Sequence, residues 1–91
     1  MEFEWDEAKA ASNKRKHGVD FEDALQIFAG RVVMRPDDRR DYGEVRLIAL
    51  GELKGCVLKV IFTRRGRHYR LISAWKANRR DQATYRANVI G

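Results

Sequence analysis

Residues 44–74 read EVRLIALGELKGCVLKVIFTRRGRHYRLISA, three apolar segments separated by two links that contain glycine. The alternation of side chains predicts strands at residues 44–50, 56–63 and 67–74, with a shorter strand at about 31–35. The links at 51–55 and 64–67 have hairpin length, and their glycines can adopt the positive φ that tight turns need. We therefore predict that consecutive strands pair as an antiparallel meander.

The N-terminal residues predict a short strand followed by a helix. Glu2-Phe3-Glu4-Trp5 alternates between polar and apolar side chains, and Asp6 is a suitable N-cap for a helix over residues 6–17. Gly18 suits the left-handed position that ends such a helix. The basic residues 14–17 then lie in the last helical turn, where they complement the helix dipole.

Two further helices complete an α+β pattern. An apolar stripe at helical spacing consists of Phe21, Ala24, Leu25 and Phe28. It predicts a core-facing helix that opens at Asp20 and ends before Gly30, and a third helix is predicted over about 76–88. The expected fold is one domain over residues 1–91 in the order β-α-α-β-β-β-β-α. Its antiparallel sheet is covered on one face by two N-terminal helices and a C-terminal helix.

Length and composition exclude several classes of protein. The chain has 91 residues, of which 44% are hydrophobic and 35% are charged, as expected for one globular domain. Cys56 is the single cysteine, so an intrachain disulfide is excluded, and no apolar run approaches the length of a membrane span. We expect a soluble, cytoplasmic protein in a reducing compartment.

No metal or cofactor is expected from the residue types available. One cysteine and two histidines, His17 and His68, give no spacing typical of a zinc site. The acidic segment 37–41 is interleaved with arginines and follows Pro36. This segment predicts a solvated loop rather than a site for a divalent cation.

The charge is distributed unevenly along the chain. Residues 1–45 carry 8 Lys and Arg against 11 Asp and Glu, whereas residues 46–91 carry 11 against 2, a net charge of +9. Such a surface favours binding to a polyanion, because each neutralised phosphate releases counterions. Nucleic acid is the first candidate partner. An acidic protein partner, or a charged surface without a specific partner, would fit the same charges.

Strand alternation separates a predicted core from a predicted open face. The buried set is Leu58, Val60 and Phe62. On the last strand, Arg70, Ile72 and Ala74 are predicted to share one face, and Tyr69, Leu71, Ser73 and Trp75 the other. Arg46 and Arg70 interrupt apolar strands, which indicates either an open face that binds RNA or ion pairs with Glu44 or another acid.

Several longer motifs occur in order along the chain. They are Phe3-Glu4-Trp5-Asp6-Glu7-Ala8-Lys9, Asn13 with Lys16-His17-Gly18-Val19, Phe21-Glu22-Asp23-Ala24 with Phe28, Glu44-Val45-Arg46 with Gly51, Thr63-Arg64-Arg65-Gly66, and Arg70-Leu71-Ile72-Ser73-Ala74 with Lys76-Ala77 and Tyr85. In this order and over nearly the whole chain, the sequence resembles the BrnT toxins.

The resemblance implies a toxin of a type II toxin–antitoxin pair with a RelE-like fold. It implies a ribonuclease that arrests translation and is neutralised by a BrnA-type antitoxin with a ribbon-helix-helix DNA-binding domain. It also implies a complex of two toxins with two antitoxins, which binds the promoter of its own operon mainly through the antitoxin.

Metal-independent RNA cleavage needs a base for the 2′-hydroxyl, cations for the transition state and a proton for the leaving 5′-oxygen. Glu44 or His17 is the candidate base or acid, although His17 at a helix end can instead cap carbonyls. The other candidate catalytic residues, as phosphate clamps, are Arg70, Arg46 and Arg64. RNA contacts are predicted from Arg65, Arg67, Lys76, Arg79, Arg80 and Trp75. Tyr69, Tyr85 and Trp75 either stack on bases or belong to the core.

The sequence departs from the family pattern at Trp75. Where the family has Ile-Ser-Ala-Arg and then a basic residue, this chain has Ile72-Ser73-Ala74-Trp75-Lys76. An indole thus replaces an expected cation, and the loss of one phosphate donor costs roughly two to three orders of magnitude in rate. The hypothesis is that Trp75 lowers the ribonuclease activity of this chain, which would make it an attenuated toxin. A non-catalytic nucleic-acid-binding module and a protein-interaction module are the alternative functions.

Overall fold

A computed structural model describes residues 2–89 and confirms the predicted order of helices and strands. The elements are β1 (Glu2–Glu4), α1 (Glu7–His17), α2 (Phe21–Leu25), the 3₁₀ turn η1 (Gln26–Ala29), β2 (Val32–Pro36), β3 (Arg46–Leu53), β4 (Cys56–Arg65), β5 (His68–Lys76) and α3 (Arg79–Val89). The second predicted helix is therefore an α-helix that tightens into a 3₁₀ turn before Gly30.

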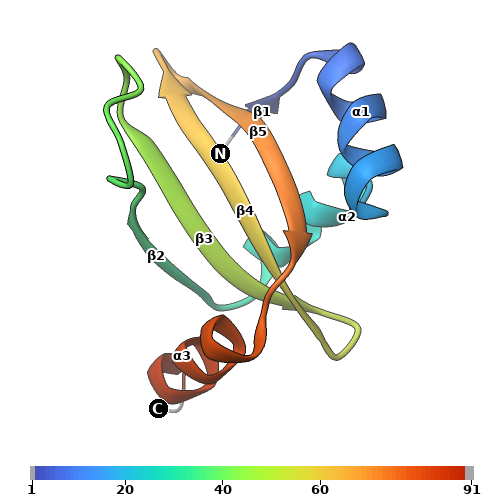
Figure 1. The fold of residues 1–91 in the computed structure, drawn as a ribbon, viewed down its shortest axis with the longest axis vertical. Coiled ribbons are helices and arrows are strands. Elements are labelled where there is room, and N and C mark those ends of the chain that lie inside the picture. The colour runs from blue at the N-terminus through green and yellow to red at the C-terminus, as the bar shows by residue number, and fades with distance from the viewer. Residues whose placement is uncertain (1, 90–91) are drawn as a thin grey trace.

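The five strands form one mixed sheet in the order β1-β5-β4-β3-β2 (Figure 1). The predicted meander is confirmed, because β2, β3, β4 and β5 pair consecutively and antiparallel. The prediction of a purely antiparallel sheet is wrong, because β1 runs parallel to β5 with Phe3 beside Tyr69. Short links fix the direction of consecutive strands only. The helical segment that separates β1 from β2 imposes no such direction on β1.

Both hairpins close with turns shorter than predicted. β3 continues through Gly51 to Leu53, so the turn consists of Lys54 and Gly55, with φ of 51° and 80°. Positive φ at both central residues is the geometry that matches the twist of paired strands. The second turn consists of Gly66 and Arg67, with φ of 62° at Gly66.

Helix α1 begins and ends where its capping residues predict. The Asp6 carboxylate accepts hydrogen bonds from the backbone N–H groups of Ala8 and Lys9. Gly18 ends the helix at φ 71°, and its N–H donates to the carbonyl of Lys14 at 2.8 Å. Both ends are thus fixed by local chemistry that the sequence displays.

The main core lies between the sheet and α2 with η1. Leu58, Val60 and Phe62 are buried there as predicted, together with Phe21 and Ala24 of α2. Gly51 of β3 lies directly under Ile27 of η1, so close that a Cβ at Gly51 would be 2.6 Å from the Ile27 Cβ. Glycine at this position lets η1 approach the sheet.

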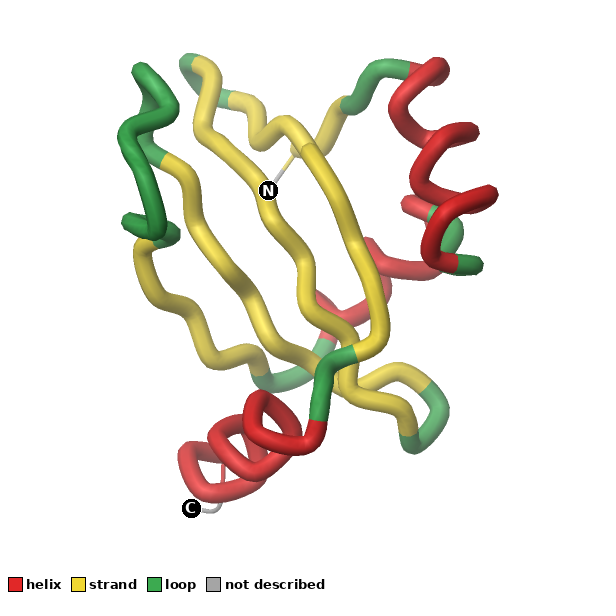
Figure 2. The backbone as a smooth tube through the Cα atoms, viewed as in Figure 1, coloured by secondary structure: helices red, strands yellow, loops and turns green. Residues whose placement is uncertain are grey.

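Helix α3 packs on the opposite face of the sheet from α2, near one end (Figures 1 and 2). Its Tyr85 and the preceding Ala77 are buried against Leu50 and Val57, which alternate away from the main core. The prediction that all helices cover a single face is therefore wrong. The sheet keeps the rest of this second face free of helices, and we call this part the open face.

A β-bulge in β5 changes which side chains share a face. Phe62 pairs with Leu71 but Ile61 pairs with Ser73, which leaves Ile72 as an extra residue. Leu71 and Ala74 therefore both point into the main core, whereas the sequence predicted opposite faces for them. The predicted sorting of β5 is wrong beyond Leu71, because one inserted residue inverts the alternation.

Asn13 holds α1 against the edge of β5 beyond the end of β1. Its carboxamide accepts a hydrogen bond from the Ala74 N–H (3.1 Å) and donates to the Ala74 carbonyl (2.8 Å). It also donates to the carbonyl of Val19 at 3.0 Å. The Asn13 side chain thus bonds the edge of β5 where a neighbouring strand would otherwise do so.

In the described range 2–89, no helix has the length and apolar character needed to cross a membrane.

Candidate active site

Four polar side chains form a line across the open face. Glu4 of β1 pairs in register with Arg70 of β5, Arg70 with Thr63 of β4, and Thr63 with Arg46 of β3. We call these four residues the cross-strand row. Neighbouring strands lie about 4.8 Å apart, so the backbones of the two arginines are about 10 Å apart. Their long side chains can therefore reach one phosphate between them.

Glu44 lies beside the row, in the loop that leads into β3. The strand starts at Arg46 rather than at residue 44 as predicted. Arg46 Nε donates to Glu44 Oε2 at 3.2 Å, and Arg65 Nη2 lies 3.7 Å from Glu44 Oε1. Arg46 thus makes the ion pair with Glu44 that was the alternative to an open RNA-binding face, and Glu44 reaches it from the loop rather than from across the sheet. These contacts bring one carboxylate and two guanidinium groups together on the solvent-accessible side of the sheet.

Arg70 is held less completely than Arg46. Its Nε lies 3.5 Å from Glu4 Oε1, but within residues 2–89 this buried nitrogen has no hydrogen-bond acceptor. A buried donor without an acceptor costs free energy. The Glu4 carboxylate therefore holds Arg70 by charge without a complete hydrogen bond.

A loop spanning residues 37–45 borders the row. Thr63 Oγ1 donates to the carbonyl of Val45 at 2.6 Å, which fixes the end of the loop to β4. The Arg46 guanidinium lies 4.0 Å from the centroid of the Tyr42 ring, and that of Arg40 lies 5.0 Å away. Tyr42 thus supports Arg46 by a cation–π contact. Sequence reasoning did not identify Tyr42 or Glu4, since neither contact follows from sequence spacing.

The same loop contains a buried acid that the sequence placed in solvent. Asp37 is buried and accepts hydrogen bonds from Arg39 Nε at 2.7 Å and Nη2 at 2.8 Å. These bonds lower the pKa of Asp37 despite its burial, and they raise the pKa of Arg39. The prediction of a wholly solvated loop is therefore wrong at Asp37. Its ion pair with Arg39 lies at the start of the loop that carries Tyr42 and Glu44.

His17 belongs to a second group on the open face. Its ring lies 5.5 Å from that of Trp75, and Lys59 Nζ lies 5.8 Å from the Trp75 ring centroid. Trp75 pairs with Lys59, which lies four residues along β4 from Thr63. The group of His17, Trp75 and Lys59 is therefore about 13 Å along the strand from the cross-strand row. The structure therefore does not place His17 beside Glu44, and it surrounds Trp75 with basic side chains.

One candidate catalytic residue, Arg64, and four of the predicted RNA-contact cations lie outside the row. Arg64 alternates to the core side of β4 and donates from Nε to the Gly66 carbonyl at 3.0 Å. The others are Arg67 in the turn, Lys76 at the end of β5, and Arg79 and Arg80 in the first turn of α3. All five are exposed. Tyr69 packs against the main core, and Tyr85 packs with Leu50, Val57 and Ala77 under α3. Both positions favour a role in the core over stacking on bases.

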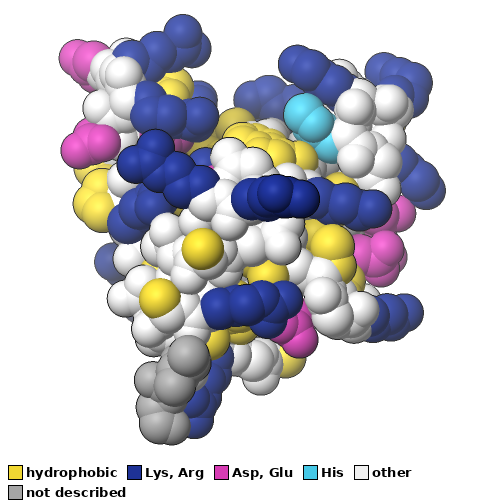
Figure 3. All heavy atoms as spheres, turned by 60° about the horizontal axis from the view of Figure 1, so that its bottom comes forward, with side chains coloured by type: hydrophobic (Ala, Val, Ile, Leu, Met, Phe, Trp, Pro, Cys, Tyr) yellow, Lys and Arg dark blue, Asp and Glu magenta, His cyan; other side chains and the backbone are white. Residues whose placement is uncertain are grey.

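The surface viewed in Figure 3 is rich in Lys and Arg side chains and contains few acidic ones. The molecule is hollowed between two projecting arms in this view. The chain as a whole carries a net charge of +6. It provides a surface to which a phosphate backbone would be attracted.

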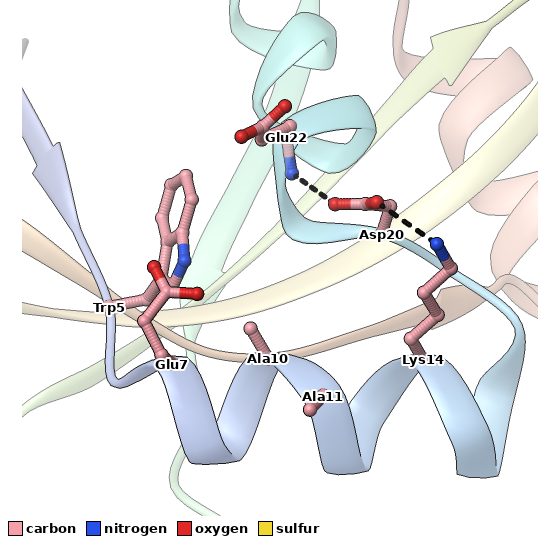
Figure 4. A pocket seen from close by; sticks show the side chains of 7 residues that line it. All are labelled: Trp5, Glu7, Ala10, Ala11, Lys14, Asp20 and Glu22. Carbon is pink, nitrogen blue, oxygen red and sulfur yellow. Dashed lines mark hydrogen bonds and ion pairs between the residues drawn. The ribbon is translucent and has the colours of Figure 1, made fainter.

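A separate cavity of about 260 Å³ lies between α1 and α2 (Figure 4). Its lining includes the acids Glu7, Asp20 and Glu22. The Asp20 carboxylate accepts a hydrogen bond from the Glu22 N–H and lies 3.5 Å from Lys14 Nζ. These interactions cap α2 and join it to α1. Three acidic side chains make this cavity unsuitable for a phosphate, so the candidate site stays on the open face.

The fold and this site define a small basic α+β domain whose open sheet face displays arginines beside a carboxylate. Residues 5–81 match the sequence model of a family described as the ribonuclease toxin, BrnT, of type II toxin–antitoxin systems. The chain belongs to this family, and the resemblance seen in its motifs is confirmed. No curated protein sequence matches the chain. The matched range includes every residue of the cross-strand row except Glu4.

Proposed function

We propose that this chain is a metal-independent endoribonuclease with a RelE-like fold, and that its active site is the cross-strand row with Glu44 and Arg65. The observation that carries the proposal is the register of three central strands, which sets Arg46 and Arg70 on the open face on either side of Thr63. Because the chain belongs to a family of ribonuclease toxins, RNA is the substrate proposed for this arrangement.

In the proposed reaction, Glu44 accepts the proton of the RNA 2′-hydroxyl. The 2′-oxygen then forms a bond to phosphorus, and the bond from phosphorus to the 5′-oxygen breaks. The proton returns through water to the leaving 5′-oxygen, so the products are a cyclic phosphate and a 5′-hydroxyl. Arg46 and Arg70 stabilise the charge that develops on the phosphate oxygens. Arg65 holds the Glu44 carboxylate in position.

Trp75 is proposed to attenuate this activity. The BrnT resemblance places an arginine where this chain has Trp75, and here the indole lies between His17 and Lys59. An arginine at this position would add a cation to the open face. Trp75→Arg is therefore expected to raise the rate of cleavage.

A type II toxin family implies an antitoxin partner. We propose a BrnA-type antitoxin that carries a ribbon-helix-helix domain and assembles as two toxins with two antitoxins. This complex would repress its own promoter. The motifs shared with the BrnT toxins support these details.

The test is cleavage of purified single-stranded RNA in excess EDTA. Trp75→Arg should cleave faster than the natural sequence, and Arg70→Ala or Glu44→Gln in that background should lower the rate about 10²- to 10³-fold. Arg64→Ala is the matched control, since this exposed arginine points away from the row. Salt-dependent RNA binding without cleavage by any form would refute a ribonuclease that acts on free RNA. It would favour a non-catalytic binding module.

A further inference from the structure

A groove of about 240 Å³ lies between α1 and β5, next to the open face. Its lining includes Lys9, Ser12, Lys16 and His17 from α1, with Ile72 and Ser73 from β5. Two features already described form this groove. Asn13 fastens α1 to the backbone of β5, and the bulge at Ile72 interrupts the regular strand beside it.

The groove gathers positive charge along one side of α1. Lys9, Ser12 and Lys16 are spaced by three and four residues, which places them on the same side of the helix. Within residues 2–89, neither lysine has an acidic group within ion-pair distance, whereas Lys14 on the opposite side of α1 lies 3.5 Å from Asp20. Glu7, the acid of α1, lines the cavity between α1 and α2 instead.

The chemistry of the lining fits a phosphodiester. Two ammonium groups and two hydroxyls offer the donors that phosphate oxygens accept. At one end the groove reaches His17, whose ring packs near Trp75 and gives a flat surface for a base. Ser73 pairs with Ile61, two residues along β4 from Thr63, so the groove begins about 7 Å along the strand from the cross-strand row.

We propose that this groove is a second phosphate subsite, in which Lys9, Lys16, Ser12 and Ser73 bind a backbone phosphate of the RNA that flanks the cleaved one. The proposal rests on the proposed function, because it takes the substrate strand to cross the row. Because α1 supplies three of the four phosphate-binding side chains, this helix would help to position the RNA.

The experiment measures binding of a fluorescent 2′-O-methyl oligonucleotide by anisotropy at several salt concentrations. This probe has no 2′-hydroxyl, so binding is measured apart from cleavage. Lys9→Ala combined with Lys16→Ala should weaken binding about tenfold, and the slope of log affinity against log salt should fall by roughly 0.7 for each lysine removed. Lys14→Ala, on the same helix outside the groove, should change the affinity less than about twofold.

A neutral methylphosphonate linkage at the flanking position should weaken binding by the natural chain but not by the double variant. If the double variant binds the probe like Lys14→Ala, the proposal is wrong. The proposal is also wrong if that variant loses affinity only for the antitoxin, since the groove then binds protein. If the probe binds as expected but RNA is not cleaved, the subsite stands and the ribonuclease proposal fails.

Discussion

Asp81 is the residue at which a single change should most clearly reveal what holds α3 to the sheet. Its carboxylate Oδ2 lies 2.9 Å from Lys59 Nζ and its Oδ1 lies 3.4 Å from Arg35 Nη2. The side chains of Asp81 and Lys59 are only 9% and 12% exposed. Asp81→Asn keeps the shape of the side chain but leaves the Lys59 ammonium nearly buried without a counter-charge.

The expected cost follows from this burial. Removing one partner of a buried ion pair destabilises a protein by about 3–5 kcal/mol, and we expect about 3 kcal/mol here because Arg35 is half exposed. A domain of this size has a free energy of unfolding of about 5–14 kcal/mol. The change should lower Tm by about 15 °C.

The ion pairs also predict how stability depends on pH. Burial alone would raise the pKa of Asp81, but the hydrogen bond and charge of Lys59, with Arg35, outweigh burial and leave the pKa below its ordinary value. A carboxyl group with a lowered pKa stabilises the fold above its unfolded pKa of about 3.9, and this contribution is lost as pH falls through the folded pKa. The disadvantage of Asp81→Asn should therefore shrink progressively as pH falls below about 4 and through the folded pKa of Asp81.

Urea unfolding followed by circular dichroism at pH 7 and pH 3 measures both effects. The control is Glu52→Gln, which removes an exposed ion pair at 3.1 Å between β3 and Arg86 of the same helix. This control should cost less than about 1 kcal/mol. Lys59→Met in the Asp81→Asn background should recover part of the loss, because it removes the isolated charge. Equal losses for Asp81→Asn and Glu52→Gln would refute the argument from burial.

Three further changes test other parts of the fold by urea unfolding. Gly51→Ala should cost about 1–3 kcal/mol because its Cβ would meet Ile27, whereas Gly30→Ala has its nearest neighbour at 3.9 Å and should be nearly neutral; equal losses would contradict the close approach. Asn13→Leu should cost about 2–3 kcal/mol, since three buried backbone groups lose their hydrogen bonds, and an unchanged midpoint would argue against this anchor. Asp37→Asn should cost about 1 kcal/mol at pH 7 and progressively less as pH falls below about 4, because the ionised carboxylate of Asp37 stabilises the fold and its pKa is lowered; a loss that does not shrink on acidification would show another cause.

The parts of the fold that were predicted correctly depend on local interactions. Asp6 and Gly18 mark the ends of α1 through bonds to residues no more than four positions away. The pairing of β3, β4 and β5 follows from links of hairpin length, and this pairing brings Arg46 and Arg70 to the same face. Short-range chemistry thus accounts for the central part of the candidate site.

The parts that were not predicted depend on contacts between distant segments. The parallel direction of β1 and the position of α3 are determined by packing, which no turn or cap displays. The bulge at Ile72 inverts the alternation of β5 without a glycine or proline to mark it. The imidazole of His17 is suited to acid–base chemistry, but the distance of His17 from Glu44 depends on how α1 packs against β5.

The pairing of Glu4 with Arg70 joins the first strand along the chain to the last strand along the chain. Such a contact closes a very long loop, and contacts of this kind form late and slowly in folding. A chain still being synthesised contains Glu4 long before β5 has emerged from the ribosome. The cross-strand row is therefore complete only once nearly the whole polypeptide has been made, and truncated chains that lack β5 cannot assemble it.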